Sequence, residues 1–505
     1  MATLEQIRTE PEGDVPTFDS LDPATGAVVG TFPIDDAASV GAVVERARDA
    51  AGWWRSLGFA GRAVHLGRYK AEIARRIDEL ADLVHRENGK PHGDAVLEIT
   101  LVLDHLTWSS TRARRVLGPH RVFPGLLAAN NSATVEYQPL GVVGVIGPWN
   151  YPVFTPMGSI AYALAAGNAV VFKPSEYTPA IGRWMVEAWR RAVPEGRDVL
   201  GLVTGLGETG AALCRSGVDK IAFTGSAATG RRVMVACAEG LVPVLMECGG
   251  KDALLVDEDA DLEAAADAAL WCGMSNGGQT CIGTERVYVA DGAYDRFVDI
   301  LTTKARQLSP GSDAGASWGP PTMPSQVDTI RRHVADAVAR GGRAVVGGEA
   351  SVDPAGVGPT ILLDVPEDAA AVREETFGPT LTVTRVRDVE EGLRLTNASD
   401  YGLGGAVFTG SRRRGIELAR RMRSGMTSVN SIMTFAMVPG LPFGGVGESG
   451  FGRIHGADGL REFTRPKAVT AQRFALPVDL TSFGRPERAT ALVAKLMGVV
   501  HGRSR

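Results

Sequence analysis

The chain of 505 residues is 44% hydrophobic and 22% charged, which excludes a disordered or fibrous protein and leaves room for two or three domains. Its formal charge of −5, without a basic block, argues against nucleic acid as a partner. The five cysteines form neither a Cys-x-x-Cys pair nor a Cys/His cluster. This pattern argues against a disulfide framework or a zinc site, so we expect reduced thiols in a cytoplasmic protein.

Two features bear on targeting and membranes. The N-terminus is polar and acidic and lacks the apolar core of a signal peptide. Residues 137–172 contain no charged side chain, but Pro139, Pro148, Pro152 and Pro156 interrupt them. Prolines break a continuous helix, and irregular backbone is not tolerated in lipid. We therefore expect no membrane span, but a buried strand, loop and helix.

The N-terminal third has helical periodicity. Apolar residues spaced at 3.6 residues per turn predict one helix around Val40–Ala51 and a second around Leu80–Val84. Beyond residue 132, short apolar strands alternate with helices of about a dozen residues, which is typical of a parallel sheet with right-handed crossovers. The predicted segments are strands in 134–149, 168–176 and 198–205, helices at 157–166 and 180–193, and a strand, turn and helix in 220–239.

A second series of the same kind follows. Residues 244–256 contain strand material, and residues 259–274 predict a helix with an aspartate cap. Further strands are predicted at 286–291, 343–348, 360–365 and 381–386. The fold class is therefore α/β, with two α/β domains that meet near residue 250.

The strongest chemical motif is Asn276-Gly-Gly-Gln-Thr-Cys281. Small residues before a cysteine let a substrate approach the thiol closely, and the backbone N–H of Cys281 can face a developing oxyanion. The alternative is a buried, inert thiol.

A carboxylate precedes that motif by about thirty residues, in Glu247-Cys-Gly-Gly-Lys251. Glu247 ends an apolar strand, where burial can raise the pKa of a carboxyl and make it a general base. The alternative is a salt bridge between Glu247 and Lys251.

Two turns suit a nucleotide. In Phe223–Gly230, Gly225 permits a turn from strand to helix, and the helix N-terminus offers N–H groups to a pyrophosphate. In Lys173-Pro-Ser-Glu176, a carboxylate at the end of a strand can accept hydrogen bonds from ribose hydroxyls. Alone, each turn is also compatible with an ordinary exposed loop.

Together these motifs resemble the aldehyde dehydrogenase superfamily, in order, from about residue 20 to residue 475. The matching segments are Pro148–Pro152, Lys173–Glu176, Phe223–Gly230, Glu247–Lys251, Gln279–Cys281, Glu375–Pro379 and Pro442–Gly445. Seven motifs in the correct order and spacing are much more specific than any one of them.

The resemblance implies a reaction and its residues. An aldehyde would be oxidised to a carboxylic acid with NAD, or alternatively NADP, through a thiohemiacetal and a thioester. Cys281 would be the nucleophile, Asn150 would stabilise the oxyanion, and Glu247 would activate the hydrolytic water. The coenzyme would be held by Trp149, Lys173, Glu176, Gly225, Ser226, Gly230, Glu375 and Phe377.

The resemblance also implies a domain organisation and an assembly. We expect a Rossmann-like cofactor domain, a catalytic domain, a small β oligomerisation arm and a C-terminal tail, in a homodimer or homotetramer. Their expected ranges are 15–119 with 139–249, 250–447, 120–138 with 464–480, and 481–505.

The chain departs from the family pattern at two places that bear on its chemistry. The family often has a Glu for proton relay where this chain has Ile454, followed by His455. Members that act on succinate semialdehyde often place an Arg on the helix after the Asn motif, whereas residues 155–166 contain none. We therefore expect an uncharged aliphatic or aromatic aldehyde as substrate.

Three alternatives to this reading stay open. The chain could be a succinate-semialdehyde-type dehydrogenase, a CoA-acylating relative or a non-catalytic structural homologue. The presence of Glu247 argues against the second, since those relatives lack this base, and the presence of Cys281, Glu247 and Asn150 together argues against the third.

The C-terminal residues 487–500 are amphipathic with basic neighbours. We expect a tail that packs on its own subunit; the alternative is a helix on a membrane surface.

Overall fold

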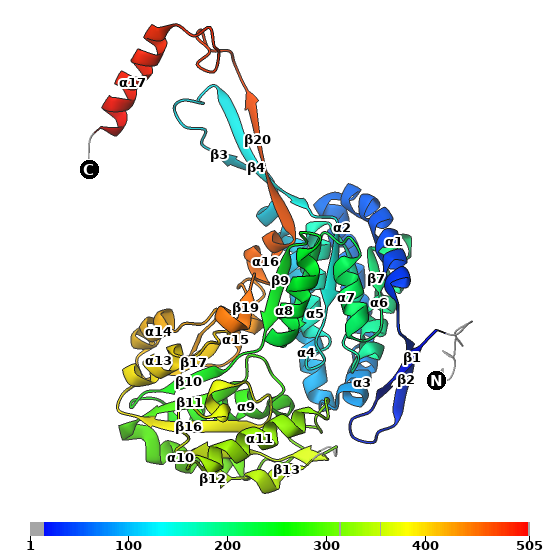
Figure 1. Cartoon of the computed structure of the whole chain (residues 1–505), viewed down its shortest axis with the longest axis vertical. Coiled ribbons are helices and arrows are strands. Elements are labelled where there is room, and N and C mark those ends of the chain that lie inside the picture. The colour runs from blue at the N-terminus through cyan, green and yellow to red at the C-terminus, as the bar shows by residue number, and fades with distance from the viewer. Residues whose placement is uncertain (1–14, 313–314, 354, 503–505) are drawn as a thin grey trace. The chain divides into compact units, whose positions relative to one another are not determined.

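The computed structural model describes residues 15–312, 315–353 and 355–502. The chain divides into two compact units, one of residues up to Val116 with Pro139–Thr464, the other of Leu117–Gln138 with Arg465 onward. The first unit contains two largely parallel sheets flanked by helices, and the second contains a small sheet (Figure 1). The α/β fold class predicted from the sequence is confirmed.

The first large sheet has the order β19-β9-β8-β5-β6-β7, and only β19 is antiparallel to its neighbour. The chain adds β6 and β7 on one side of β5, then returns to add β8 and β9 on the other. The strand order thus reverses between β5 and β8, the place where doubly wound sheets bind ligands at their carboxyl ends. The strands are β5 (Val142–Ile146), β6 (Ala169–Lys173), β7 (Leu200–Leu202), β8 (Lys220–Gly225), β9 (Val244–Cys248) and β19 (Gly450–Phe451).

Helices cover both faces of this sheet. Helices α1, α7 and α8 pack together on one face, and α5 and α6 pack on the other with α2 and α3 against them. Nearly all of α5 is buried, as expected for a helix between a sheet and a further layer. The helices are α1 (Ala37–Ser56), α2 (Gly58–Arg75), α3 (Ile77–Asn88), α4 (His92–Leu117), α5 (Phe154–Ala166), α6 (Pro179–Ala192), α7 (Gly207–Arg215) and α8 (Ala227–Ala238).

Helix α5 begins at Phe154, just under one helical turn before the predicted start at residue 157. Pro156 does not prevent this, because a proline in the first turn removes an N–H that has no partner within the helix.

The second large sheet has the order β12-β15-β16-β11-β10-β17-β18, parallel except for β12. Helices α9 and α10 pack on one face and α13 and α14 on the other. The change of sheet falls between β9 and β10, at residues 249–251. The elements are β10 (Asp252–Val256), α9 (Leu262–Met274), β11 (Thr284–Ala290), α10 (Asp291–Ala305), α11 (Gln326–Ala339), β12 (Arg343–Val346), β15 (Thr360–Leu363), β16 (Thr380–Val386), α13 (Val389–Asn397), β17 (Gly405–Phe408), α14 (Arg412–Arg421) and β18 (Ser428–Val429).

Several short elements complete the first unit. A hairpin of β1 (Thr17–Leu21) and β2 (Val28–Pro33) precedes α1, and it has no counterpart among the predicted segments. None of the helices in the described ranges is both long and apolar enough to cross a membrane. The remaining elements are β13 (Val352–Asp353), β14 (Gly356–Val357), α12 (Ala370–Arg373), α15 (Thr434–Met437), α16 (Gly456–Glu462) and the 3₁₀ helices Pro194–Val199, Ser275–Gly278, Glu349–Ser351 and Gly447–Ser449.

The second unit has a three-stranded sheet of order β20-β4-β3 and a terminal helix. Beyond its first residue, every side chain of β20 is exposed. Its elements are β3 (His120–Val122), β4 (Asn131–Pro139), β20 (Thr464–Gln472) and α17 (Glu487–His501).

Candidate active site

Cys281 follows a tight turn at the C-terminal end of α9. Asp261 caps the start of that helix, as predicted, by accepting a hydrogen bond from the N–H of Ala264 (3.1 Å). In the turn, Gly278 has φ +73°, and a Cβ there would lie 2.0 Å from the carbonyl oxygen of Gly378. Only glycine permits this approach. Cys281 is partly exposed, whereas the other four cysteines are buried.

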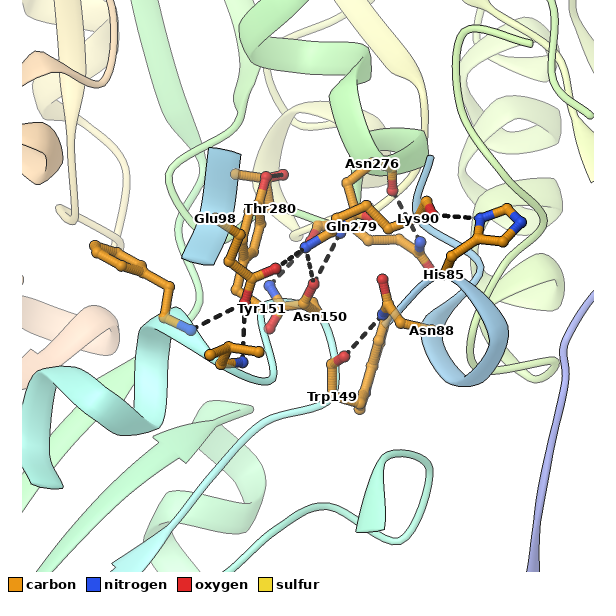
Figure 2. A network of polar contacts seen from close by, with 12 residues as sticks. His85, Asn88, Lys90, Glu98, Trp149, Asn150, Tyr151, Asn276, Gln279 and Thr280 are labelled. Carbon is orange, nitrogen blue, oxygen red and sulfur yellow. Dashed lines mark hydrogen bonds and ion pairs between the residues drawn. The ribbon is translucent and has the colours of Figure 1, made fainter. Parts of the chain in front are cut away.

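Asn150 lies in the loop between β5 and α5 and is buried. Its side-chain Nδ2 donates to the backbone oxygen of Gln279 (2.9 Å), two residues before Cys281. Its own carbonyl oxygen accepts from Asn276 Nδ2 (3.0 Å) and Lys90 Nζ (3.1 Å). Figure 2 shows this network, which joins the loops of the two sheets. The structure thus brings Asn150 and the Cys281 segment together.

Glu98 on α4 fixes the loop that carries Asn150 through an ion pair and two hydrogen bonds. Its carboxylate forms an ion pair with Lys90, and both side chains are almost fully buried. The same carboxylate accepts from the backbone N–H groups of Val153 and Phe154 (2.9 Å each). Glu98 therefore caps the N-terminus of α5 with negative charge, where the helix dipole favours it.

Sequence reasoning missed Lys90 and Glu98. One signal was available: Glu98 is a carboxylate within the apolar run from Val96 to Ile99, and a charge on the buried face of a helix needs a partner.

A second branch of the network holds Gln279 and Trp149. Gln279 Oε1 accepts from the N–H of Thr322 (2.9 Å), and its Nε2 donates to the carbonyl of Asn276 (2.8 Å). Asn88 Nδ2 donates to the carbonyl of Trp149 (2.9 Å) and to Thr322 Oγ1 (3.1 Å). The backbone on both sides of Asn150 is therefore fixed by buried amides.

Glu247 is 2% exposed and is paired in register with Thr224 of β8. Its Oε2 accepts from Thr224 Oγ1 (3.3 Å), while Oε1 has no hydrogen-bond partner among the described residues. Burial raises the pKa of Glu247 to about 8, against the lowering effects of Thr224 and of the Arg453 charge. Lys251 forms its ion pair with Glu285, so the Glu247–Lys251 salt bridge that the sequence left open is not formed.

The pKa of the Cys281 thiol lies well above its usual range. Burial is the main cause, and the nearby carboxyls of Glu247, Glu375 and Asp252 add to it. A raised pKa favours the protonated thiol, so forming a thiolate at Cys281 would require a base.

Lys173 and Glu176 lie at the carboxyl end of β6. Lys173 is 4% exposed, and its Nζ donates to the carbonyl of Pro174 (3.2 Å). Burial lowers the pKa of Lys173, and the charge of Glu176 opposes this. A buried ammonium beside a partly exposed carboxylate leaves polar atoms that a ribose can engage.

Gly225, Ser226 and Gly230 lie at the end of β8 and the start of α8. Ser226 is the exposed N-cap of the helix, and its Oγ accepts from the N–H of Thr229 (3.3 Å). Gly230 is buried, and a Cβ there would lie 3.2 Å from Cys248 Sγ. The helix N-terminus faces the carboxyl edge of the sheet, a position that suits a pyrophosphate.

Glu375 and Phe377 reach the same region from the second sheet. Glu375 accepts from the N–H of Gly250 (2.9 Å), and a Cβ on Gly249 would lie 2.1 Å from its Oε2. Burial raises the pKa of Glu375 to about 8. Phe377 has φ +53°, a strained value, and its ring meets that of Trp149 edge-on at 5.5 Å. The absence of a side chain on Gly249 thus lets the Glu375 carboxyl lie against the backbone, and this carboxyl and the two aromatic rings are groups that a nucleotide can contact.

The Ile454–His455 pair lies beside helix α5: the His455 ring is 5.5 Å from that of Phe154, and a Cβ on Gly158 would meet both side chains. Ile454 is buried and exchanges backbone hydrogen bonds with Phe443 (2.7 and 2.8 Å). His455 has φ +62°, and its ring lies 3.9 Å from that of His105, tilted by 49°. Neither of its ring nitrogens has a hydrogen-bond partner within the described ranges. The proton relay questioned from the sequence therefore has no carboxylate at residue 454.

Known proteins resemble this chain in sequence and fold. The model of the aldehyde dehydrogenase family matches residues 9–469. The chain is 36% identical over 466 residues to 4,4'-diapolycopene aldehyde oxidase of Methylomonas sp, covering 92% of this chain and 87% of that protein. It is also 36% identical over 455 residues to glutarate-semialdehyde dehydrogenase of Pseudomonas aeruginosa, covering 88% and 92%.

Solved structures agree. PnpE from Pseudomonas sp. WBC-3, also solved in complex with nicotinamide adenine dinucleotide, superposes with a TM-score of 0.87 at 32% identity, over 92% of this chain and 96% of that one. The resemblance inferred from the seven motifs is confirmed. The chain belongs to the aldehyde dehydrogenase family.

Proposed function

We propose that this enzyme oxidises an aldehyde to a carboxylate with NAD(P)⁺, using Cys281 as nucleophile, Asn150 as oxyanion donor and Glu247 as general base. The observation that carries the proposal is the buried network that ties Asn150 to the backbone of Gln279, beside Cys281. The charge of Glu247 raises the pKa of the Cys281 thiol, and Oε1 of this carboxyl has no hydrogen-bond partner among the described residues.

The Asn150 amide has a second N–H besides the one that Gln279 accepts. When the thiolate of Cys281 attacks the aldehyde carbon, a tetrahedral thiohemiacetal forms and its oxygen becomes negative. The second N–H of Asn150 and the backbone N–H of Cys281 can then donate to that oxygen. Because the loop is already held by Lys90 and Asn276, the donor does not reorganise during the reaction.

The chemistry that bound NAD(P)⁺ supplies is acceptance of the hydride from the thiohemiacetal carbon. Cys281 then carries a thioester. Glu247 takes a proton from a water molecule, the resulting hydroxide attacks the thioester carbon, and the carbon–sulfur bond breaks. The carboxylate leaves and the thiol is restored, so Glu247 returns to its starting state after releasing its proton.

For the coenzyme, we propose that Lys173 and Glu176 bind the adenosine ribose and Ser226 the pyrophosphate, with Gly225 and Gly230 allowing close approach. Glu375 would bind the nicotinamide ribose, with Phe377 against the nicotinamide ring and Trp149 close to the pyrophosphate. The Glu176 carboxylate would repel a 2′-phosphate, which favours NAD over NADP. Comparison of kcat/KM for the two coenzymes in wild type and Glu176→Gln tests this, and a strong NADP preference in wild type contradicts it.

For the substrate, we propose an uncharged aliphatic or aromatic aldehyde. Helix α5 carries no arginine that could pair with a second carboxylate. The likeness to a glutarate-semialdehyde dehydrogenase supports a second candidate, a semialdehyde with a distal carboxylate. A panel of aldehydes matched in length, with and without a terminal carboxylate, separates the two through kcat/KM.

The reaction type has its own test. We expect NADH formation from aldehyde and NAD⁺ without CoA, and none with Cys281→Ala. A strict requirement for CoA would favour an acylating enzyme, and equal rates for the two proteins would show that Cys281 is not the nucleophile.

For assembly, we propose a homodimer or homotetramer in the cytoplasm. The exposed outer strand β20 offers unpaired backbone groups that a second copy can cover. Sedimentation velocity distinguishes monomer, dimer and tetramer.

A further inference from the structure

The C-terminal helix α17 has no buried side chain, although it is rich in aliphatic residues. Leu492 is 68% exposed and Val499 65%, and Leu496 and Val500 are also exposed. Ahead of the helix, the ring of Phe483 is fully exposed. A contiguous apolar surface of this kind is uncommon on a protein unless something covers it.

The larger apolar residues of α17 lie on one broad side, together with Ala489. At 100° per residue, they fall within a sector of about 160°. This sector is formed by Ala489, Leu492, Val493, Leu496, Met497, Val499 and Val500. The opposite side contains Thr490, Ala491, Ala494 and Gly498. A sector this broad exceeds the narrow seam that pairs two helices in a coiled coil and suits a continuous apolar medium.

The tail is positively charged in an acidic protein. Residues 473–505 contain six basic and two acidic side chains, a formal charge of +4, whereas the whole chain carries −5. Arg488 and Lys495 lie at one border of the apolar sector, where long basic side chains can reach lipid headgroups while the aliphatic residues sink below them. The exposed Phe483 precedes Arg485 and Arg488, an aromatic and basic combination typical of interfacial anchors.

We propose that α17 is a surface anchor that binds anionic lipid bilayers. The helix has 15 residues, about 22 Å, which is shorter than the hydrocarbon core of a bilayer. It would therefore lie in the plane of the interface, with its apolar sector among the acyl chains and its basic residues at the phosphates. The anchor would bring the active enzyme to a membrane surface independently of its chemistry.

The test is co-sedimentation of the full-length protein with vesicles of phosphatidylglycerol and phosphatidylcholine, and with vesicles of phosphatidylcholine alone. We expect at least about tenfold tighter binding to the anionic vesicles, weakened by salt. Leu492→Asp with Leu496→Asp should abolish binding. The matched control, Ala491→Asp with Ala494→Asp, adds the same charge on the opposite side and should keep most of it.

Three results would overturn the proposal. One is no binding of wild type to anionic vesicles, and another is equal loss with both aspartate pairs. The third is a fall in sedimentation coefficient with the leucine pair in the absence of lipid, which would assign the helix to a second copy of the chain. Turnover of a water-soluble aldehyde, measured for each variant, separates failure of the anchor from failure of the proposed reaction.

Discussion

The pKa of Glu247 gives a prediction for the pH dependence of turnover. A general base acts only as the carboxylate, and a pKa of about 8 means that about one carboxyl in ten is ionised at pH 7 and about nine in ten at pH 9. Because burial raises this pKa, activity must increase with pH. We expect thioester hydrolysis to accelerate about tenfold between pH 7 and pH 9.

Thr224→Val tests whether ionisation of Glu247 causes this increase of the hydrolysis rate with pH. The Thr224 hydroxyl is the one side chain that donates to Glu247 among the described residues, and valine keeps its shape. At 3.3 Å the bond is long, so its loss should disfavour the carboxylate by about 0.5 kcal/mol. That energy corresponds to about 0.4 pH unit, an upward shift of the midpoint that lowers the rate at pH 7 about twofold.

Stopped-flow measurement of NADH separates acylation, seen as a burst, from hydrolysis, seen in the steady state. Thr302→Val is the control, since its hydroxyl is bonded to Val298 within α10 and should leave the midpoint unchanged. Glu247→Gln removes the base from both steps, so the burst and the steady-state rate should each fall by a factor of about 10²–10⁴. If the pH–rate profiles of Thr224→Val and wild type have the same midpoint, another group controls the rate and Glu247 is not the base.

Three further predictions follow from the geometry. Asn150→Ala should slow the NADH burst by about 10²–10³-fold, the loss typical of one oxyanion donor; an unchanged burst would remove Asn150 from the site. Glu98→Gln leaves the buried ammonium of Lys90 without its carboxylate, so urea unfolding should show a loss of about 3–5 kcal/mol, and no loss would mean that the pair is not buried in solution. Gly249→Ala places a Cβ against Glu375 and should weaken coenzyme binding about tenfold, or by about 1.4 kcal/mol, in a fluorescence titration; unchanged binding would separate Glu375 from the coenzyme.

Local sequence patterns were sufficient to predict most of the two large sheets. Strands such as Ala169–Lys173 are short apolar runs that end at glycine or proline, and the helices between them are long enough to cross over. The hairpin of Thr17–Leu21 and Val28–Pro33 was not predictable in this way. Its strands are mostly exposed or half-exposed, so they lack the clear alternation that identifies a strand.

At the candidate site, too, the sequence predicts local motifs but not the tertiary contacts between them. Cys281, Glu247 and the nucleotide turns stand in recognisable local motifs, and the family resemblance supplied expected roles. The connections between the motifs depend on tertiary packing. Spacing alone does not show that the carbonyl of Asn150 is held by Lys90, or that Lys251 pairs with Glu285 rather than with its near neighbour Glu247.

We propose that Glu247 serves as the base in both steps of the reaction, because its pKa and that of the Cys281 thiol are both raised and the two groups are coupled. Ionisation of Glu247 raises the pKa of the Cys281 thiol, and by reciprocity a thiolate would oppose ionisation of Glu247. Both anions together are therefore disfavoured, and the first proton to leave the pair comes from Glu247, whose pKa is the lower one. Its carboxylate can then take the thiol proton as the sulfur attacks. Once the thioester forms, sulfur no longer ionises, so Glu247 is free to lose its proton and serve again as the base for water.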